Sequence, residues 1–320
     1  MITLLYVFGA LALLLTLLAI VSRRTARRID AFLPPTGSFV EVDGMRLHVR
    51  DEGGGPALLL IHGLGGQMAH FNYGAVRELA QRYRVVAVDR PGSGHSTRPA
   101  GTPADLATQA RAIALLIERL GLERPTVVGH SLGGAIALTL ALNHPQRVGA
   151  LALVAPLTHA PEGVPSAFRA LTIETPWLRR LFAATLAVPL SIVASKGVLA
   201  QVFGPEAVPR DFPTRGGGLL SLRPTQFLAS SADLQALPGH MPGLAARYAE
   251  LAGLGVPLHI LFGRDDAILD WRANGQALTD KVPGARLELV EGGHMLPVTQ
   301  PERTARFVEE VVQTRVRPAS

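Results

Sequence analysis

The 320-residue chain contains no cysteine, and only 5% of its residues are aromatic and 18% charged. The lack of cysteine excludes a disulfide scaffold, a thiolate metal site and a cysteine nucleophile. Lysine occurs only at Lys196 and Lys281, so the net charge of +6 reflects arginine usage. Because no basic stripe interleaved with aromatic residues is present, we expect no nucleic-acid partner. Hydrophobic residues make up 48% of the chain, which is enough for a sizeable core.

The first 21 residues carry no charged side chain. As a helix they would reach about 31 Å, the thickness of the hydrocarbon core of a bilayer. An uncleaved single-pass anchor is favoured over a cleaved signal peptide, because no basic segment precedes the run and arginines follow it. Those arginines are Arg23, Arg24, Arg27 and Arg28. Since positive residues tend to stay in the cytoplasm, we expect the rest of the chain to be cytoplasmic.

These features divide the chain into a transmembrane anchor at 1–22, a basic juxtamembrane linker at 23–37 and one folded domain at 38–320. Within the domain, two segments of alternating apolar and polar residues flank Asp43-Gly44 and predict a β-hairpin. Continuous apolar runs predict buried strands, which are typical of a parallel sheet with helices on both faces. The runs lie at 57–63, 84–89, 125–130, 148–154, 257–263 and 285–290.

Helical patterns alternate with these strands, at 102–120, 132–142 and 301–315. The first is expected to begin with Thr102 as its N-cap and to stop at Gly121. Strands alternating with helices predict a doubly wound, mostly parallel α/β sheet.

Residues 157–255 interrupt this alternation, because they contain many prolines and no clear buried strand. We expect a mostly helical insertion above the sheet, a lid. The only charges in its apolar segment 177–203 are Arg179, Arg180 and Lys196. Core packing is the favoured interpretation for most of this segment. The alternative is a lid that touches a membrane interface and admits lipophilic substrates.

The sequence Gly129-His130-Ser131-Leu132-Gly133 lies between a predicted buried strand and a helix start. This context is typical of a nucleophile elbow, in which a tight turn lifts a serine above the sheet edge. At the N-terminus of the helix, backbone N–H groups can stabilise developing negative charge. Ser131 is therefore the candidate nucleophile.

A serine nucleophile needs a base and an orienting acid, and the carboxyl ends of the strands are the place to look. His294 lies in the loop after the last predicted strand, and Asp265 and Asp266 follow the strand before it. The histidines show no metal-ligand spacing, so we expect neither a metal nor a cofactor.

Five motifs together resemble the α/β-hydrolase superfamily from about residue 38 to 315. They are His62–Gly66, Asp89–Ser96, Gly129–Gly134, Gly263–Asp266 and Gly293-His294. The resemblance implies the α/β-hydrolase fold.

By the same resemblance, Ser131 is the nucleophile, His294 the base and Asp266 the acid, with Asp265 as its rival. The resemblance also implies an oxyanion hole formed by the backbone N–H groups of Leu64 and Leu132. His62, His130 and the Asp89–Ser96 loop are expected to support this site rather than to react.

Serine at position 131 directs the chemistry towards acyl transfer, because dehalogenases and epoxide hydrolases of this fold carry aspartate there. We expect a membrane-anchored serine esterase or lipase-like hydrolase, whose substrate is a small, lipophilic, acylglycerol-like ester. A C–C bond hydrolase, a cofactor-free peroxidase or an acyltransferase would use the same triad. The alternative of another class is a non-catalytic binding module on the same fold.

Overall fold

The computed structural model describes residues 1–316. An eight-stranded sheet with the order β1-β2-β4-β3-β5-β6-β7-β8 forms the centre of the domain. β2 pairs antiparallel with β1 and β4, and the other neighbours are parallel. The predicted hairpin and the mostly parallel sheet are therefore confirmed. The strands are β1 (Ser38–Val42), β2 (Met45–Glu52), β3 (Ala57–Ile61), β4 (Arg84–Val88), β5 (Thr126–His130), β6 (Ala150–Val154), β7 (Leu258–Gly263) and β8 (Arg286–Val290).

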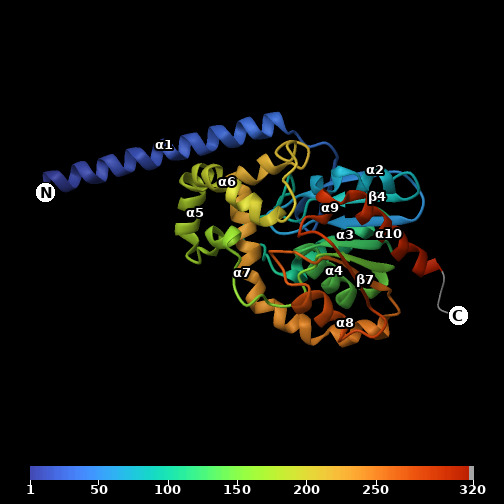
Figure 1. Ribbon diagram of the computed structural model, residues 1–320. Coiled ribbons are helices and arrows are strands. Elements are labelled where there is room, and N and C mark those ends of the chain that lie inside the picture. Colours follow the sequence, from blue (N-terminus) through green and yellow to red (C-terminus); the bar gives the residue numbers. More distant parts are fainter. Residues whose placement is uncertain (317–320) are drawn as a thin grey trace.

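The central strands are continuously apolar because both faces of the sheet are covered. In β3, Leu59 and Ile61 join the core on one face, and Leu58 and Leu60 join the core on the other. Two helices, α3 (Leu106–Arg119) and α4 (Leu132–Asn143), pack on the first face. On the second face, α2 (Ala75–Leu79) and α10 (Pro301–Val316) complete the layered arrangement seen in Figure 1.

The helix expected from residue 102 begins only at Leu106, so Thr102 is not its N-cap. Asp105 takes that place, because its carboxylate accepts a hydrogen bond from the N–H of Thr108 at 2.8 Å. At the other end Gly121 has a φ of +60°, as expected for a helix stop.

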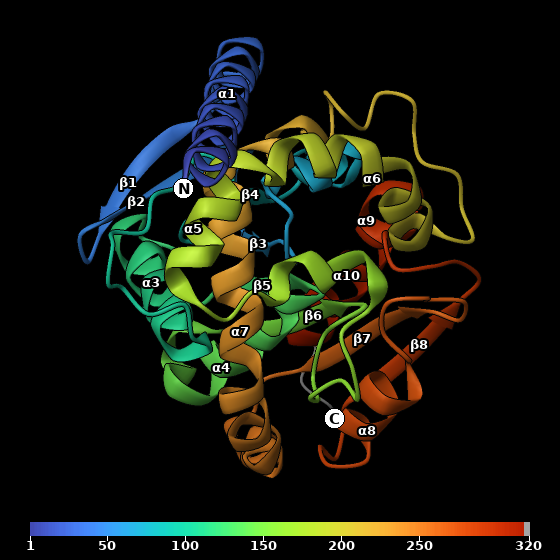
Figure 2. The ribbon, with the colours of Figure 1, turned by 90° about the vertical axis from the view of Figure 1, so that its left-hand side faces the viewer.

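The insertion between β6 and β7 is helical, as predicted. It contains η3 (Ser166–Thr172), α5 (Pro176–Thr185), α6 (Ala187–Phe203), η4 (Gly218–Leu222), α7 (Pro224–Ala246) and η5 (Tyr248–Leu254). In Figure 2, α5, α6 and α7 lie in front of the central strands. The remaining short elements are η1 (Met68–Tyr73), η2 (Pro145–Arg147), η6 (Arg272–Gln276), α8 (Ala277–Thr279) and α9 (Leu296–Thr299).

The N-terminal helix α1 (Ile2–Phe32) projects from the domain (Figure 1) and reaches a mean hydropathy of 2.7 over an 18-residue window. By length and composition it can cross a membrane. The helix continues through the basic segment that we expected to belong to a linker, so only 33–37 connects it to β1. The hydroxyl of Ser22 donates to the carbonyl of Thr185 at 3.0 Å, and Asp30 forms an ion pair with Arg223 at 2.9 Å. These contacts hold the C-terminal part of α1 against the lid.

Candidate active site

Ser131 stands at the sharp turn between β5 and α4, with a φ of 54° and a ψ of −121°. This conformation is strained for a residue with a side chain, so it must be held by its surroundings. The N–H of Ser131 donates to the carbonyl of Val154 in β6 at 3.1 Å. Its carbonyl accepts from the N–H groups of Gly134 at 2.8 Å and Leu157 at 3.0 Å. The backbone of the serine is thus bonded on both sides.

The turn also requires glycine beside the serine. A Cβ atom at Gly129 would lie 2.6 Å from the carbonyl oxygen of Gly133. A Cβ atom at Gly133 would lie 2.1 Å from the carbonyl oxygen of Ile61 in β3. Because both contacts are with backbone atoms, no side-chain rotation could relieve them. The predicted strand–turn–helix context of the motif is therefore present.

His294 and Asp266 lie together at the carboxyl ends of β8 and β7. The Nδ1 atom of His294 is 2.7 Å from Oδ2 of Asp266, and the two side chains are only 5% and 1% exposed. The other carboxylate oxygen of Asp266 accepts from the N–H groups of Ile268 at 2.8 Å and Leu269 at 2.9 Å. Asp265 is exposed, and its N–H donates to the carbonyl of Gly292. Of the two candidate acids, Asp266 is the partner of His294.

Ser131 and His294 line the same cavity, which encloses about 580 Å³. Leu64 and Leu132 line it as well. The loop that contains Leu64 lies against the serine, since a Cβ atom at Gly63 would be 3.3 Å from the Ser131 hydroxyl oxygen. Within residues 1–316, the N–H groups of Leu64 and Leu132 donate to no protein acceptor. Both groups are thus available for an oxygen in the cavity.

His62 supports this loop. Its Nδ1 atom lies 2.9 Å from the carbonyl oxygen of Gly63, and its Nε2 atom accepts from the N–H of Arg90 at 3.0 Å. Burial, followed by the nearby Arg90 charge, lowers the pKa of His62 well below its usual value. The ring is therefore neutral at physiological pH, in keeping with a supporting role.

Arg90 is a supporting residue that the sequence analysis did not single out. Its guanidinium is completely buried and donates to the carbonyl oxygens of His62 and Gly63, each at 3.0 Å. It also forms an ion pair at 2.8 Å with Asp233 of α7, which is fully buried too. The sequence offers little to identify this role. Arg90 appears there only as a charged residue within the Asp89–Ser96 motif, and its partner Asp233 lies 143 residues away. The pair joins the lid to the loop beside the serine.

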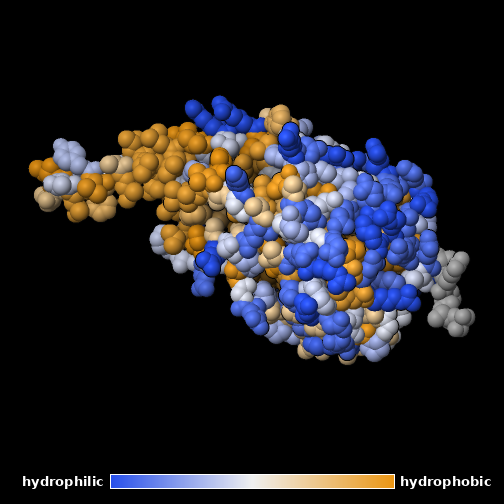
Figure 3. Space-filling view, viewed as in Figure 1, coloured by the Kyte–Doolittle hydropathy of each residue, from blue (hydrophilic) through white to orange (hydrophobic). Residues whose placement is uncertain are grey.

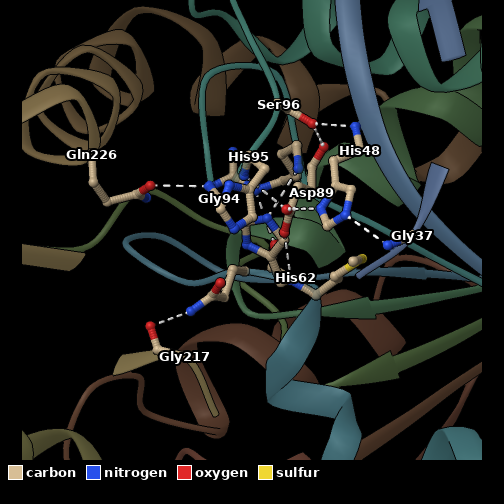
Figure 4. A network of polar contacts seen from close by, with 12 residues as sticks. Gly37, His48, His62, Asp89, Gly94, His95, Ser96, Gly217 and Gln226 are labelled. Atoms are coloured by element: carbon tan, nitrogen blue, oxygen red, sulfur yellow. Dashed lines mark hydrogen bonds and ion pairs between the residues drawn. The ribbon is translucent and has the colours of Figure 1, made fainter. Parts of the chain in front are cut away.

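Asp89 organises the Asp89–Ser96 loop (Figure 4). Its carboxylate receives hydrogen bonds from the N–H groups of Met68 at 2.8 Å and His95 at 2.9 Å, and Nδ1 of His48 lies 2.8 Å away. The hydroxyl of Ser96 donates to the carbonyl of Asp89 at 2.6 Å. These bonds agree with the expectation that this segment is held together internally.

His130 links the elbow to the loop of His294. Its Nε2 atom lies 3.0 Å from the carbonyl oxygen of His294, and the two rings are 5.0 Å apart between centroids. Because burial lowers the pKa of His130 well below its usual value, the ring is neutral and donates through Nε2. The bond fixes the backbone of His294 next to the elbow.

Most of the cavity wall is apolar and comes from the lid. The apolar side chains from α6 include Ala187, Leu190, Ile192, Val198, Leu199 and Val202. η3 and α7 contribute Phe168, Leu171, Phe227 and Leu237. A cavity of this composition suits a lipophilic molecule whose reactive carbon lies beside the serine.

Comparisons with known proteins are consistent with this geometry. A family model described as alpha/beta hydrolase fold matches residues 56–301. The uncharacterized protein Rv2715 of Mycobacterium tuberculosis is 33% identical over 91% of this chain and 85% of its own length. The 2-hydroxymuconate semialdehyde hydrolase of Pseudomonas putida is 29% identical over 86% of this chain and 94% of its own.

Among solved structures, a membrane phospholipase A described as a bacterial virulence factor superimposes with a TM-score of 0.71. It is 26% identical to this chain, and the alignment covers 98% of this chain and 96% of the other. The similarity therefore includes the region of the N-terminal helix as well as the sheet and the lid.

Proposed function

The chain belongs to the α/β-hydrolase fold family, and from that membership we propose that it is a serine hydrolase of lipophilic carboxylic esters. The observation that carries the proposal is the buried Asp266–His294 pair on the same cavity as Ser131. Ser131 would act as nucleophile, His294 as base and Asp266 as orienting acid.

In this reaction the Ser131 hydroxyl oxygen attacks the ester carbonyl carbon while Nε2 of His294 removes its proton. The C–O bond to the alcohol then breaks, and the imidazolium of His294 gives its proton to the departing oxygen. Water, deprotonated by His294, next attacks the carbonyl carbon of the acyl-serine. The C–O bond to Ser131 then breaks, the imidazolium of His294 returns its proton to the serine oxygen, and the carboxylic acid leaves. Asp266 accepts the Nδ1–H hydrogen bond throughout, which leaves Nε2 free to act as the base.

The negative charge that develops on the carbonyl oxygen needs hydrogen-bond donors. We assign this role to the backbone N–H groups of Leu64 and Leu132, which border the cavity beside Ser131. The loss of one such donor typically raises the barrier by about 2.7–4 kcal/mol. Main-chain donors explain why apolar residues are acceptable at both positions.

The substrate class follows from the cavity wall. An apolar cavity of about 580 Å³ favours an acyl chain over a charged or strongly polar group, so we propose acylglycerol-like or related lipid esters. The similarity to a membrane phospholipase A supports this choice. The second candidate is a hydrolase that cleaves another kind of bond. The similarity to the 2-hydroxymuconate semialdehyde hydrolase of Pseudomonas putida supports this candidate.

We also propose that α1 anchors the enzyme in a membrane, with the span at 1–22 and the hydrolase domain at 38–320 in the cytoplasm. The four arginines that follow the apolar run support this orientation.

Hydrolysis of a series of esters of increasing acyl length tests the proposal. The rate should rise from acetate to octanoate, because longer chains bury more apolar surface in the cavity. The Ser131→Ala variant is the control and should hydrolyse none of them. A steep preference for acetate would contradict the lipophilic substrate, and hydrolysis that survives in Ser131→Ala would contradict the nucleophile. Addition of an alcohol acceptor would reveal acyl transfer by forming a new ester.

A further inference from the structure

The two lid helices α5 and α6 expose an apolar surface. They meet at a bend of 76°, so they lie across the lid rather than forming one straight helix. The exposed large side chains on these helices and the turn between them are Trp177, Leu178, Leu181, Leu186, Leu190, Ile192 and Val193. Core packing, the interpretation that the sequence favours for most of the segment 177–203, is wrong for these residues. Only a few of its members, such as Ala183 and Val188, are buried. An apolar surface of this size marks an interaction site.

This surface lies on the side of the domain from which α1 projects (Figure 1). Figure 3 shows hydrophobic residues along the projecting part of α1 and on the adjoining side of the domain. Ser22, the last uncharged residue before Arg23, is bonded to Thr185 at the end of α5. The end of α5 therefore lies at the level where the apolar part of α1 ends. A bilayer crossed by α1 would meet α5 and α6.

The same surface borders the opening of the cavity. Leu190 and Ile192 of α6 line the cavity and are also 48% and 51% exposed. They are therefore at its mouth, whereas Ser131 lies at the buried end. Basic side chains accompany the apolar ones on both helices, at Arg179, Arg180 and Lys196. Such a combination suits the boundary between lipid headgroups and acyl chains.

We propose that the exposed face of α5 and α6 rests in the membrane interface and that the cavity opens into the lipid leaflet. The substrate is then a lipid that enters from the bilayer without passing through water. The choice of a lipid ester rests on the proposed function, whereas the contact with the membrane does not. The two parts can therefore be tested separately.

The first test measures the contact without any hydrolysis. The chain has two tryptophans, Trp177 on α5, which is 67% exposed, and Trp271, which stacks beneath Arg272. The full-length Trp271→Phe variant, reconstituted in phosphatidylcholine vesicles, reports on Trp177 alone. Lipids with brominated acyl chains should quench its fluorescence. The matched Trp177→Phe variant, which keeps Trp271, should be unaffected. Trp177 fluorescence that is not quenched, or is quenched no more than that of Trp271, would overturn the proposal.

The second test measures lipid entry. Val193 is 82% exposed on α6 and does not line the cavity, so Val193→Asp changes the surface only. The rate on a long-chain monoacylglycerol in the same vesicles should fall by about tenfold, because a carboxylate is costly to bring into an apolar interface. The rate on a water-soluble short-chain ester should not change. The control Gln313→Asp adds the same charge on α10, at the opposite end of the domain in Figure 1, and should alter neither rate.

An unchanged monoacylglycerol rate in Val193→Asp, or an equal loss on both substrates, would overturn lateral entry. If the wild-type protein hydrolysed neither ester while Trp177 was still quenched, the proposed function would fail and the membrane contact would stand.

Discussion

Replacing Asp266 with asparagine should abolish most activity while leaving the fold intact. One carboxylate oxygen of Asp266 accepts from two backbone N–H groups, and the other faces Nδ1 of His294. The asparagine carbonyl oxygen can keep the two backbone bonds only if its NH₂ group faces His294. That NH₂ group donates a hydrogen bond, so Nδ1 must become the acceptor and Nε2 must carry the proton. Nε2 can then no longer remove the proton of Ser131.

A triad base held in the wrong tautomer typically loses about 10⁴-fold in kcat. The assay is the kcat for a short-chain ester, with the melting temperature measured in parallel to show that the variant is folded. Asp265→Asn is the matched control, because Asp265 is exposed and lies next to Asp266 in the sequence. It should keep nearly full activity. Equal losses in the two variants, or a loss in Asp265→Asn alone, would refute the assignment of Asp266.

Three further predictions concern the structure that supports the site. Asp233→Ala should lower the free energy of unfolding by about 3–5 kcal/mol, measured by urea denaturation, because it leaves the buried Arg90 charge without its partner. Gly133→Ala should abolish hydrolysis, since its Cβ would lie 2.1 Å from the carbonyl oxygen of Ile61; activity equal to wild type would contradict the tight turn. Burial lowers the pKa of His70 to about 4, so below its ordinary pKa unfolding takes up a proton and stability falls as pH decreases. From pH 7 to pH 5 the loss from this group should be about 2 kcal/mol. His70→Gln should reduce the change in the free energy of unfolding between these pH values, measured by urea denaturation, by that amount.

Much of the fold could be predicted from the sequence because its signals are local. The central strands are buried on both faces and appear as unbroken apolar runs, and the elbow requires glycine at fixed positions around Ser131. The order of serine, acid and histidine along the chain follows from the order of the strands that carry them. The resemblance favours Asp266 over Asp265, and the structure supplies the contact that separates them, since Asp266 lies 2.7 Å from Nδ1 of His294 and Asp265 is exposed.

Other features depend on contacts between distant segments. Arg90 could not be identified as a support because its partner lies in the lid. The helical state of the basic segment 23–32, which we expected to belong to a linker, goes with contacts of α1 with the lid residues Thr185 and Arg223 that the sequence does not show. Proline usually interrupts a helix, yet α7 continues through Pro238 and Pro242. The exposed face of α5 and α6 has the apolar composition of a core helix, so the sequence does not show that it is exposed. The structure shows this exposure and the position of the face beside α1.

The identity of the nucleophile is tested most directly by labelling the protein with a fluorophosphonate and locating the adduct by mass spectrometry. We predict a single adduct on Ser131, absent from Ser131→Ala and strongly slowed in His294→Ala, because the serine needs a base to react. An adduct on another residue, or labelling of Ser131→Ala at the wild-type rate, would contradict the account.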